Sequence, residues 1–200
     1  MAEAILFVWY PGQEGGRAVA SLLFGDASPS GKLTVTFPKA TTDLPPFEEY
    51  SMTGRTYRYA TIDPLFPFGF GLSYASFEYQ DLKIIPPSAP TTGFRVAVKL
   101  KNTGSVVADE VVQLYLSAIE CRLPAPLSQL IAFQRVSFKP GQTKTVHFDV
   151  TPGMLMLFDE DGRQVLEGGK FRLTAGGCSP SARGAALGAP QPVSQEFTIS

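Results

Sequence analysis

Acidic side chains are the first candidates for chemistry in this sequence, because two carboxyl groups that face each other across a cleft can hydrolyse a glycosidic bond. The candidate pairs are Glu48-Glu49 and the run Asp159-Glu160-Asp161. Adjacent residues on one strand point to opposite faces, so neither run provides a facing pair by itself. Asp161-Gly162 is also typical of a hairpin turn, in which acidic side chains are solvated. We therefore predict that neither run is catalytic.

Glu14 is better placed, because it lies between an expected strand end and an expected helix start, where ligands gather in α/β sheets. An acidic residue near a helix N-terminus also stabilises the helix dipole, and we favour this simpler explanation. The surrounding Gly12-Gln13-Glu14-Gly15-Gly16 resembles a phosphate-binding loop only superficially. No Gly-Lys-Ser/Thr follows it and the GxGxxG spacing is missing, so a phosphate site is not predicted.

Histidine and cysteine offer little for a metal or a nucleophile. The single histidine, His147, falls on the outward phase of an expected strand and has no nearby cysteine. Cys121 and Cys178 both lie in loop-like sequence. They fit either one disulfide or two unpaired thiols, and unpaired thiols are favoured. Without a CxxC pair or a second histidine, we expect no metal site, and the residues alone indicate neither an active site nor a cofactor.

Composition and charge exclude several classes of protein. The 200 residues include 17 Lys and Arg against 18 Asp and Glu, a net charge of −1, which argues against binding to nucleic acid or to an anionic membrane. No apolar run approaches the roughly 20 residues that a bilayer span needs. The first residues lack the basic region and cleavage site of a signal peptide. Hydrophobic residues make up 44%, and 19 Gly and 17 Pro predict a globular chain rich in turns and strands.

The first 40 residues predict one βαβ unit. Residues 4–10 form an apolar run that ends at Pro11-Gly12 and is typical of a strand buried on both faces. Residues 15–25 carry an apolar helical face, and residues 33–38 are a second expected strand. One such unit cannot cover both faces of a parallel sheet. The chain is therefore expected to begin inside a larger α/β domain.

Residues 41–75 have little periodicity and many aromatic side chains, including Tyr50 and Tyr57. Aromatic rings could stack on sugar rings, but packing of an irregular connector across a surface is the favoured interpretation.

From about residue 76 the apolar period changes to two, which is typical of strands with one buried face. The alternating apolar sets are Phe94, Val96, Val98 and Leu100; Val146, Phe148 and Val150; Phe171, Leu173 and Ala175; and Val193, Phe197 and Ile199. Around Gln134-Arg135 the apolar phase slips, which predicts a β-bulge. About seven short strands at this spacing predict a β-sandwich of the immunoglobulin or fibronectin type III kind.

Several strings, taken together, are more specific than any of these features. The first group is Trp9-Tyr10-Pro11-Gly12-Gln13-Glu14-Gly15-Gly16, Leu23-Phe24-Gly25-Asp26, Pro29-Ser30-Gly31-Lys32-Leu33 and Gly54-Arg55-Thr56-Tyr57-Arg58-Tyr59, then Pro67-Phe68-Gly69-Phe70-Gly71-Leu72-Ser73-Tyr74. These strings resemble the C-terminal end of glycoside hydrolase family 3. The later strings Asn102-Thr103-Gly104, Glu110-Val111-Val112-Gln113-Leu114-Tyr115 and Phe158-Asp159-Glu160-Asp161-Gly162 resemble the fibronectin type III-like domain that ends many of these enzymes.

The resemblance implies a mostly β fold in which a partial α/β segment precedes a fibronectin type III-like sandwich. The implied domains are residues 1–40 (the end of the α/β sandwich domain), 41–75 (the connector) and 76–200 (the β-sandwich). Family members hydrolyse β-glucosides, β-xylosides, α-L-arabinofuranosides or N-acetylglucosaminides with retention and without a cofactor. Their catalytic Asp and Glu motifs lie upstream of Trp9, so no residue of this sequence inherits a catalytic role. Tyr50 and Tyr57 are weak candidates for contact with the substrate cleft.

Three hypotheses follow for the role of the chain. It is the C-terminal part of a glycosidase and inert alone, a brace for catalytic domains, or a free-standing module that binds polysaccharide or a partner protein. The βαβ segment favours the first, since a self-sufficient module has no use for half a sheet. In that case a saccharide substrate would bind only through the upstream catalytic domains. The uncovered α/β segment is an expected surface for self-association. Full-length relatives are often secreted or periplasmic, but this sequence predicts no compartment of its own.

Overall fold

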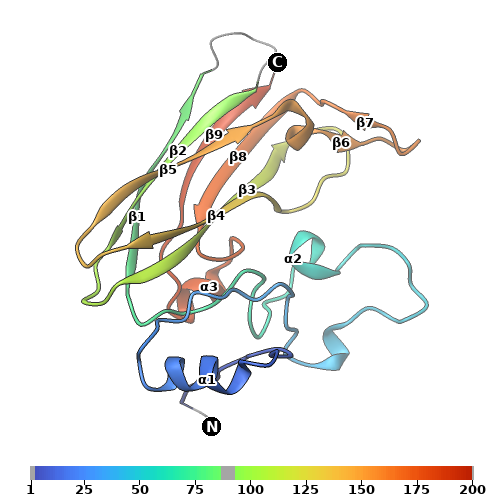
Figure 1. The fold of residues 1–200 in the computed structure, drawn as a ribbon. Coiled ribbons are helices and arrows are strands. Elements are labelled where there is room, and N and C mark those ends of the chain that lie inside the picture. The colour runs from blue at the N-terminus through green and yellow to red at the C-terminus, as the bar shows by residue number, and fades with distance from the viewer. Residues whose placement is uncertain (1–2, 87–92, 200) are drawn as a thin grey trace.

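A β-sandwich dominates the chain, and a less regular N-terminal part lies beneath one end of it (Figure 1). The computed structural model describes residues 3–86 and 93–199. The elements in chain order are α1 (Gly15–Leu23), the 3-10 helix η1 (Thr41–Asp43), α2 (Thr56–Tyr59), β1 (Phe77–Ile85), β2 (Phe94–Asn102), β3 (Ala108–Glu120), β4 (Gln129–Phe138), β5 (Thr143–Val150), the 3-10 helix η2 (Pro152–Leu155), β6 (Leu157–Phe158), β7 (Gln164–Val165), β8 (Gly169–Gly176), α3 (Ala182–Ala186) and β9 (Val193–Ile199).

The sandwich has a three-stranded sheet, in the order β1-β2-β5, and a four-stranded sheet, in the order β4-β3-β8-β9. All neighbouring strands are antiparallel, and β6 pairs with β7 in a separate ribbon. Alternation along each strand sends one set of side chains inward. In β5, for example, Val146, Phe148 and Val150 are buried, whereas His147 is exposed. The predicted β-sandwich and the outward position of His147 are confirmed.

Large apolar side chains from both sheets fill the space between them. Leu100, Phe138 and Phe171 are fully buried, and Phe138 packs edge-to-face against Phe77 with ring centroids 5.6 Å apart. Burying a side chain of this size contributes about 1.5–3 kcal/mol to folding. The sandwich therefore has a continuous core of its own.

The bulge in β4 lies three to four residues before the predicted position. Leu114 pairs with Ala132 while the next residue, Tyr115, pairs with Leu130, so Ile131 is the extra residue. Gln134 and Arg135 keep regular partners. The prediction was wrong because Phe133 is 68% exposed, so the apolar pattern there includes one aromatic ring that faces solvent.

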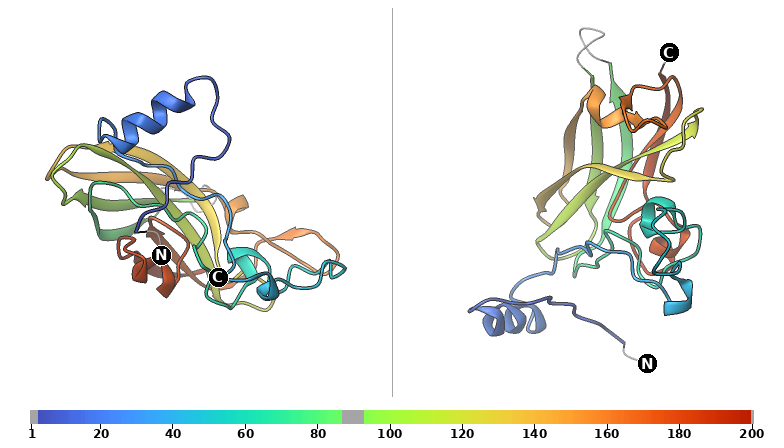
Figure 2. Two further views of the ribbon diagram at one scale, coloured as in Figure 1. Left: turned by 90° about the horizontal axis from the view of Figure 1, so that it is seen from below. Right: turned by 90° about the vertical axis from the view of Figure 1, so that its right-hand side faces the viewer.

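The expected helix of the N-terminal segment is present as α1, but the segments on either side of it form no strands. Residues 4–10 have no ladder partner in the described chain, and the backbone turns at Trp9, where φ is +53°. Residues 33–38 make only one isolated bridge, Phe37 to Phe66. A strand needs a continuous ladder of paired residues. Residues 65–70 do lie beside residues 33–38, but only Leu33 and Phe37 exchange backbone hydrogen bonds with them, so no continuous ladder forms. Figure 2 shows α1 standing out to one side of the sandwich.

The connector crosses the open end of the sandwich and packs on the loop that carries α3. Phe70, Cys178 and Ala189 form a small second core there, against which Leu33 and Phe66 pack. The irregular backbone of residues 41–75 is thus anchored by side chains at its C-terminal end.

Candidate functional site

The acidic residues considered from the sequence do not converge. Glu49 accepts a hydrogen bond from the Ser51 backbone N–H (2.9 Å) in an exposed loop, and Asp159 accepts two backbone N–H groups in the turn between β6 and β7. Glu14 precedes α1 and makes no side-chain capping bond, although a negative charge is favourable at that end of the helix. These carboxylates shape turns and a helix end, and they do not face one another as a pair.

Tyr50 lies on a loop whose conformation is stabilised by hydrogen bonds from the Arg55 side chain. Arg55 donates to the carbonyl oxygens of Pro46 (3.0 Å), Glu49 (2.5 Å) and Ser51 (3.1 Å). Tyr50 and Phe47 are each 92% exposed on this loop. The loop therefore presents two aromatic rings to its surroundings.

Tyr57, the other aromatic candidate, is built into the junction between the connector and the sandwich. Its ring stacks on Phe68 with centroids 4.2 Å apart and meets Tyr115 edge-on at 6.0 Å. Its hydroxyl accepts a hydrogen bond from the Leu130 backbone N–H (3.1 Å). The structure therefore places Tyr50 and Tyr57 in different settings, one exposed and one packed.

A buried polar cluster beneath the sandwich was not predicted from the sequence. The Lys32 ammonium lies 3.3 Å from the Glu110 carboxylate and donates to the Gly71 carbonyl at 2.8 Å. Tyr79 donates its hydroxyl to the other Glu110 oxygen at 3.1 Å. A Cβ at Gly177 would lie 2.8 Å from Glu110, so only a glycine leaves room there. The cluster joins the N-terminal segment, the connector, β1, β3 and the end of β8.

Burial governs the electrostatics of this cluster. Burial raises the pKa of the Glu110 carboxyl above its usual value, and the Lys32 ammonium and the Tyr79 hydroxyl offset this only in part. Burial, and then the Glu110 charge, raise the pKa of Tyr79 well above its ordinary value. A charge pair removed from water in this way is costly to break from one side.

Gln113 forms a second buried connection beside the first. Its amide donates to the carbonyl oxygens of Gly69 (3.1 Å) and Gly177 (2.8 Å), and its own oxygen accepts the Tyr115 hydroxyl at 2.5 Å. Gly69 has φ +78°, and a Cβ there would lie 2.1 Å from the Gln113 oxygen. The Gln113 side chain therefore occupies space that is free only because residue 69 is a glycine.

One signal in the sequence could have revealed the connection at Glu110. Glu110 has the same phase along β3 as the buried residues Val112 and Leu114. A charged residue on the buried phase of a strand predicts a buried partner, although it does not say which residue that partner is.

A hollow of about 330 Å³ opens beside Tyr57. Its walls come from four parts of the chain: Thr36, the connector around residues 57–67, Leu127, and residues 179–182 at the start of α3. It contains hydroxyl groups and one carboxylate, that of Asp63.

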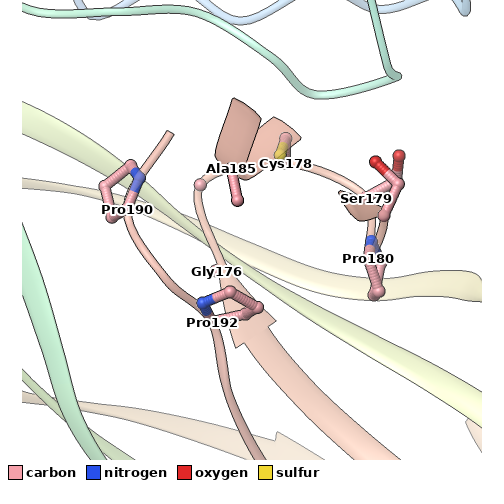
Figure 3. Close-up of a pocket in the computed structure, with 9 residues that line it drawn as sticks. Gly176, Cys178, Ser179, Pro180, Ala185, Pro190 and Pro192 are labelled. Atoms are coloured by element: carbon pink, nitrogen blue, oxygen red, sulfur yellow. The ribbon is translucent and has the colours of Figure 1, made fainter. Parts of the chain in front are cut away.

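The two cysteines are free thiols, so the favoured prediction is confirmed. Burial raises the pKa of Cys178 to about 11. This residue borders a small cavity between the end of β8 and α3, whose volume of about 10 Å³ is room for one water molecule (Figure 3). That cavity is too small for an organic ligand.

Across residues 3–86 and 93–199, no group of three or more His, Cys, Asp or Glu side chains is placed to hold a metal ion. Within the same ranges, no helix combines the length and the apolar character that crossing a bilayer requires.

Comparisons with known proteins agree on one family. Residues 1–74 match the glycosyl hydrolase family 3 C-terminal domain, and residues 110–179 match the fibronectin type III-like domain. The chain is 44% identical over 177 residues to a xylan 1,4-β-xylosidase of Xylanibacter ruminicola, a match that covers 87% of this chain and 20% of the relative. A β-glucosidase of Bacteroides ovatus is 37% identical over 200 residues, which are 90% of this chain and 27% of the relative.

Solved structures show the same relationship. A β-glucosidase of Kluyveromyces marxianus in complex with glucose superposes with a TM-score of 0.80 at 31% identity, over 96% of this chain and 24% of that one. A β-glucosidase of Erythrobacter marinus gives 0.77 at 35% identity, over 96% and 24% of the two chains. This chain therefore spans about a fifth to a quarter of the length of the relatives that it matches.

Proposed function

Because this chain belongs to glycoside hydrolase family 3 and corresponds to the C-terminal part of its enzymes, we propose that it is the structural C-terminal part of a retaining glycosidase. The substrates of that enzyme are β-xylosides, β-glucosides or α-L-arabinofuranosides. In this proposal the nucleophile and the acid/base belong to the part of the enzyme that precedes Trp9. The chain alone then hydrolyses nothing.

One observation carries the proposal: the core of the sandwich is buried, whereas the apolar N-terminal segment is uncovered. Val96, Val98 and Leu100 on β2 are completely buried, whereas Ile5 is 69% and Tyr10 is 99% exposed. Each large apolar side chain left in water forgoes about 1.5–3 kcal/mol of stabilisation. Such a run is retained where another part of the same enzyme covers it. The relatives are several times longer than this chain, which is consistent with such a covering part.

The buried clusters support a bracing role for the sandwich. Lys32 belongs to the segment next to the uncovered surface, and Glu110 belongs to the central strand β3 of the larger sheet. The ion-paired Lys32 and the β3 residue Gln113 both donate to carbonyl oxygens of the connector, so the connector is bonded to the sandwich at two points. A sandwich held in this way restrains whatever packs on residues 4–24.

A chimera tests the proposal. The C-terminal fifth of the Xylanibacter ruminicola β-xylosidase is replaced by this chain at the matched boundary, and hydrolysis of nitrophenyl xyloside is measured. We expect the chimera to retain activity, the relative without any C-terminal part to lose it, and the isolated chain to stay at the buffer rate. A chimera that carries Lys32→Met should be active but less resistant to heat. An active truncated relative, or turnover by the isolated chain that disappears when one of its carboxylates is mutated, would overturn the proposal.

A further inference from the structure

The hollow beside Tyr57 has the size and the lining of a small-molecule site. Its volume of about 330 Å³ falls at the lower end of the roughly 300–1,000 Å³ of such sites. Apolar side chains, among them Ile62 and Leu127, form much of its wall. Besides Tyr57, the polar lining residues are four that bear hydroxyl groups and one that is acidic: Thr36, Thr61, Ser179, Ser181 and Asp63.

Several of these polar groups retain hydrogen-bonding capacity. Thr36 and Ser181 accept backbone N–H groups with their oxygens, at 3.1 and 3.3 Å, so their hydroxyl hydrogens are available to a ligand. Within the described ranges, neither Thr61 nor Asp63 makes a side-chain hydrogen bond, and both are exposed. The hollow therefore combines donors with one strong acceptor.

The lining selects the class of ligand. The one charged group is a carboxylate and no Lys, Arg or His belongs to the wall, so an anion such as a phosphate is disfavoured. A purely apolar molecule would leave the hydroxyls and the carboxylate without partners. A molecule with several hydroxyl groups and an apolar C–H face satisfies both parts of the wall.

We propose that this hollow is a binding site for a neutral sugar, either free or at the end of a glycan. The Asp63 carboxylate accepts sugar hydroxyls, the Thr61 and Ser181 hydroxyls donate to sugar oxygens, and Ile62 and Leu127 contact the apolar face of the ring. The lining residues that the proposal uses all belong to this chain, so binding can be examined with this chain.

The test is a titration of the isotope-labelled chain, followed by amide NMR shifts, with xylose, glucose and xylotetraose as separate ligands. We expect saturable shifts clustered on residues 57–67, 127–130 and 179–184, with millimolar dissociation constants for the monosaccharides. Shifts produced by xylotetraose alone would place the end of a glycan in the hollow, and shifts produced by all three would place any neutral sugar there. Both results support the proposal.

Variants distinguish binding in the hollow from non-specific binding elsewhere on the chain. Asp63→Ala should weaken binding about tenfold or more, since it removes a charged acceptor, and Thr61→Val should weaken it by a smaller factor. Asp26→Ala, which removes an exposed carboxylate that does not line the hollow, is the matched control and should bind as the parent does. Absence of saturable shifts in the hollow, shifts centred instead on Phe47 and Tyr50, or equal affinity of Asp63→Ala and the parent would each overturn the proposal. Circular dichroism checks that Asp63→Ala is folded, and Thr61→Val provides a second, conservative test.

Discussion

The Lys32 ammonium lies 3.3 Å from the Glu110 carboxylate, although 78 positions separate the two residues in the chain. The two side chains are 9% and 2% exposed, whereas every other ion pair in the described residues has at least one partner well exposed to solvent. The pair connects the N-terminal segment to the central strand of the larger sheet. Its energetics therefore decide how firmly the two parts of the molecule are joined.

Removing Lys32 should be strongly destabilising, because it leaves a buried carboxylate without its partner. We expect Lys32→Met to lower the free energy of unfolding by about 3–5 kcal/mol. The double variant Lys32→Met/Glu110→Gln should be more stable than Lys32→Met alone, since it buries no unpaired charge. Urea denaturation measures both. Lys83→Met, in an exposed pair with Asp81, is the control and should change stability by at most about 1 kcal/mol. A double variant less stable than Lys32→Met would contradict this account.

Glu110 should also leave a signature in the pH dependence of stability. Its folded pKa is raised by burial, so between the unfolded value of about 4.3 and the folded value the native state binds more protons than the unfolded chain. The free energy of unfolding contributed by Glu110 therefore falls as the pH rises through this window and is constant above it. The difference between the parent and Glu110→Gln, measured by urea denaturation from about pH 4 to 8, isolates this contribution. A difference that rises with pH would show that the pKa is lowered instead.

Gly69 should tolerate no side chain. Gly69→Ala places a Cβ at a position 2.1 Å from the Gln113 oxygen and forces φ +78° on a non-glycine residue. Gly141→Ala carries a similar φ of +71° but meets nothing within 4 Å. Both substitutions should lower the free energy of unfolding by more than about 1 kcal/mol through backbone strain. Gly69→Ala should lower it clearly more than Gly141→Ala, because it also displaces the Gln113 contacts. Thermal unfolding compares them, and equal losses would show that the contact with Gln113 contributes nothing.

The two thiols should react at very different rates. Cys178 is buried with a pKa raised to about 11, so at pH 8 only about one thiol in a thousand is ionised. Cys121 is partly exposed. Alkylation with iodoacetamide, followed by peptide mass mapping, should modify Cys121 first and Cys178 only after unfolding in urea. Failure of both cysteines to react in urea without reductant would indicate a disulfide.

The uncovered N-terminal surface should make the isolated chain self-associate. Tyr10 is 99% and Phe24 is 84% exposed, and both lie in the segment that we propose is covered in the complete enzyme. Sedimentation velocity should show weaker association for the double variant Tyr10→Ser/Phe24→Ser than for the parent. The matched control, Phe47→Ser/Tyr50→Ser, removes two equally exposed rings from the Arg55-held loop and should associate as the parent does. A chain that stays monomeric at high concentration would exclude self-association through this surface.

The sequence by itself determined those features that depend on neighbouring residues. The strands of the sandwich were recognisable because alternation of apolar and polar side chains is local, and α1 because its apolar residues repeat at helical spacing. The strings around Trp9, Gly54 and Pro67 were enough to indicate the family. The position of the bulge was predicted wrongly because Phe133 is apolar but exposed, so the apolar pattern does not follow the buried face of the strand there.

Only the tertiary structure decided what depends on distant partners. The βαβ pattern predicted strands over residues 4–10 and 33–38. Within the described residues, the first run has no backbone neighbour, and the second meets residues 65–70 only at Leu33 and Phe37, too few contacts for a strand ladder. The Lys32–Glu110 pair, the Gln113 contacts and the hollow near Asp63 unite residues that lie tens of positions apart. A pattern of polarity along the chain records whether a side chain is buried, and the path of the backbone in three dimensions decides which other side chain it meets.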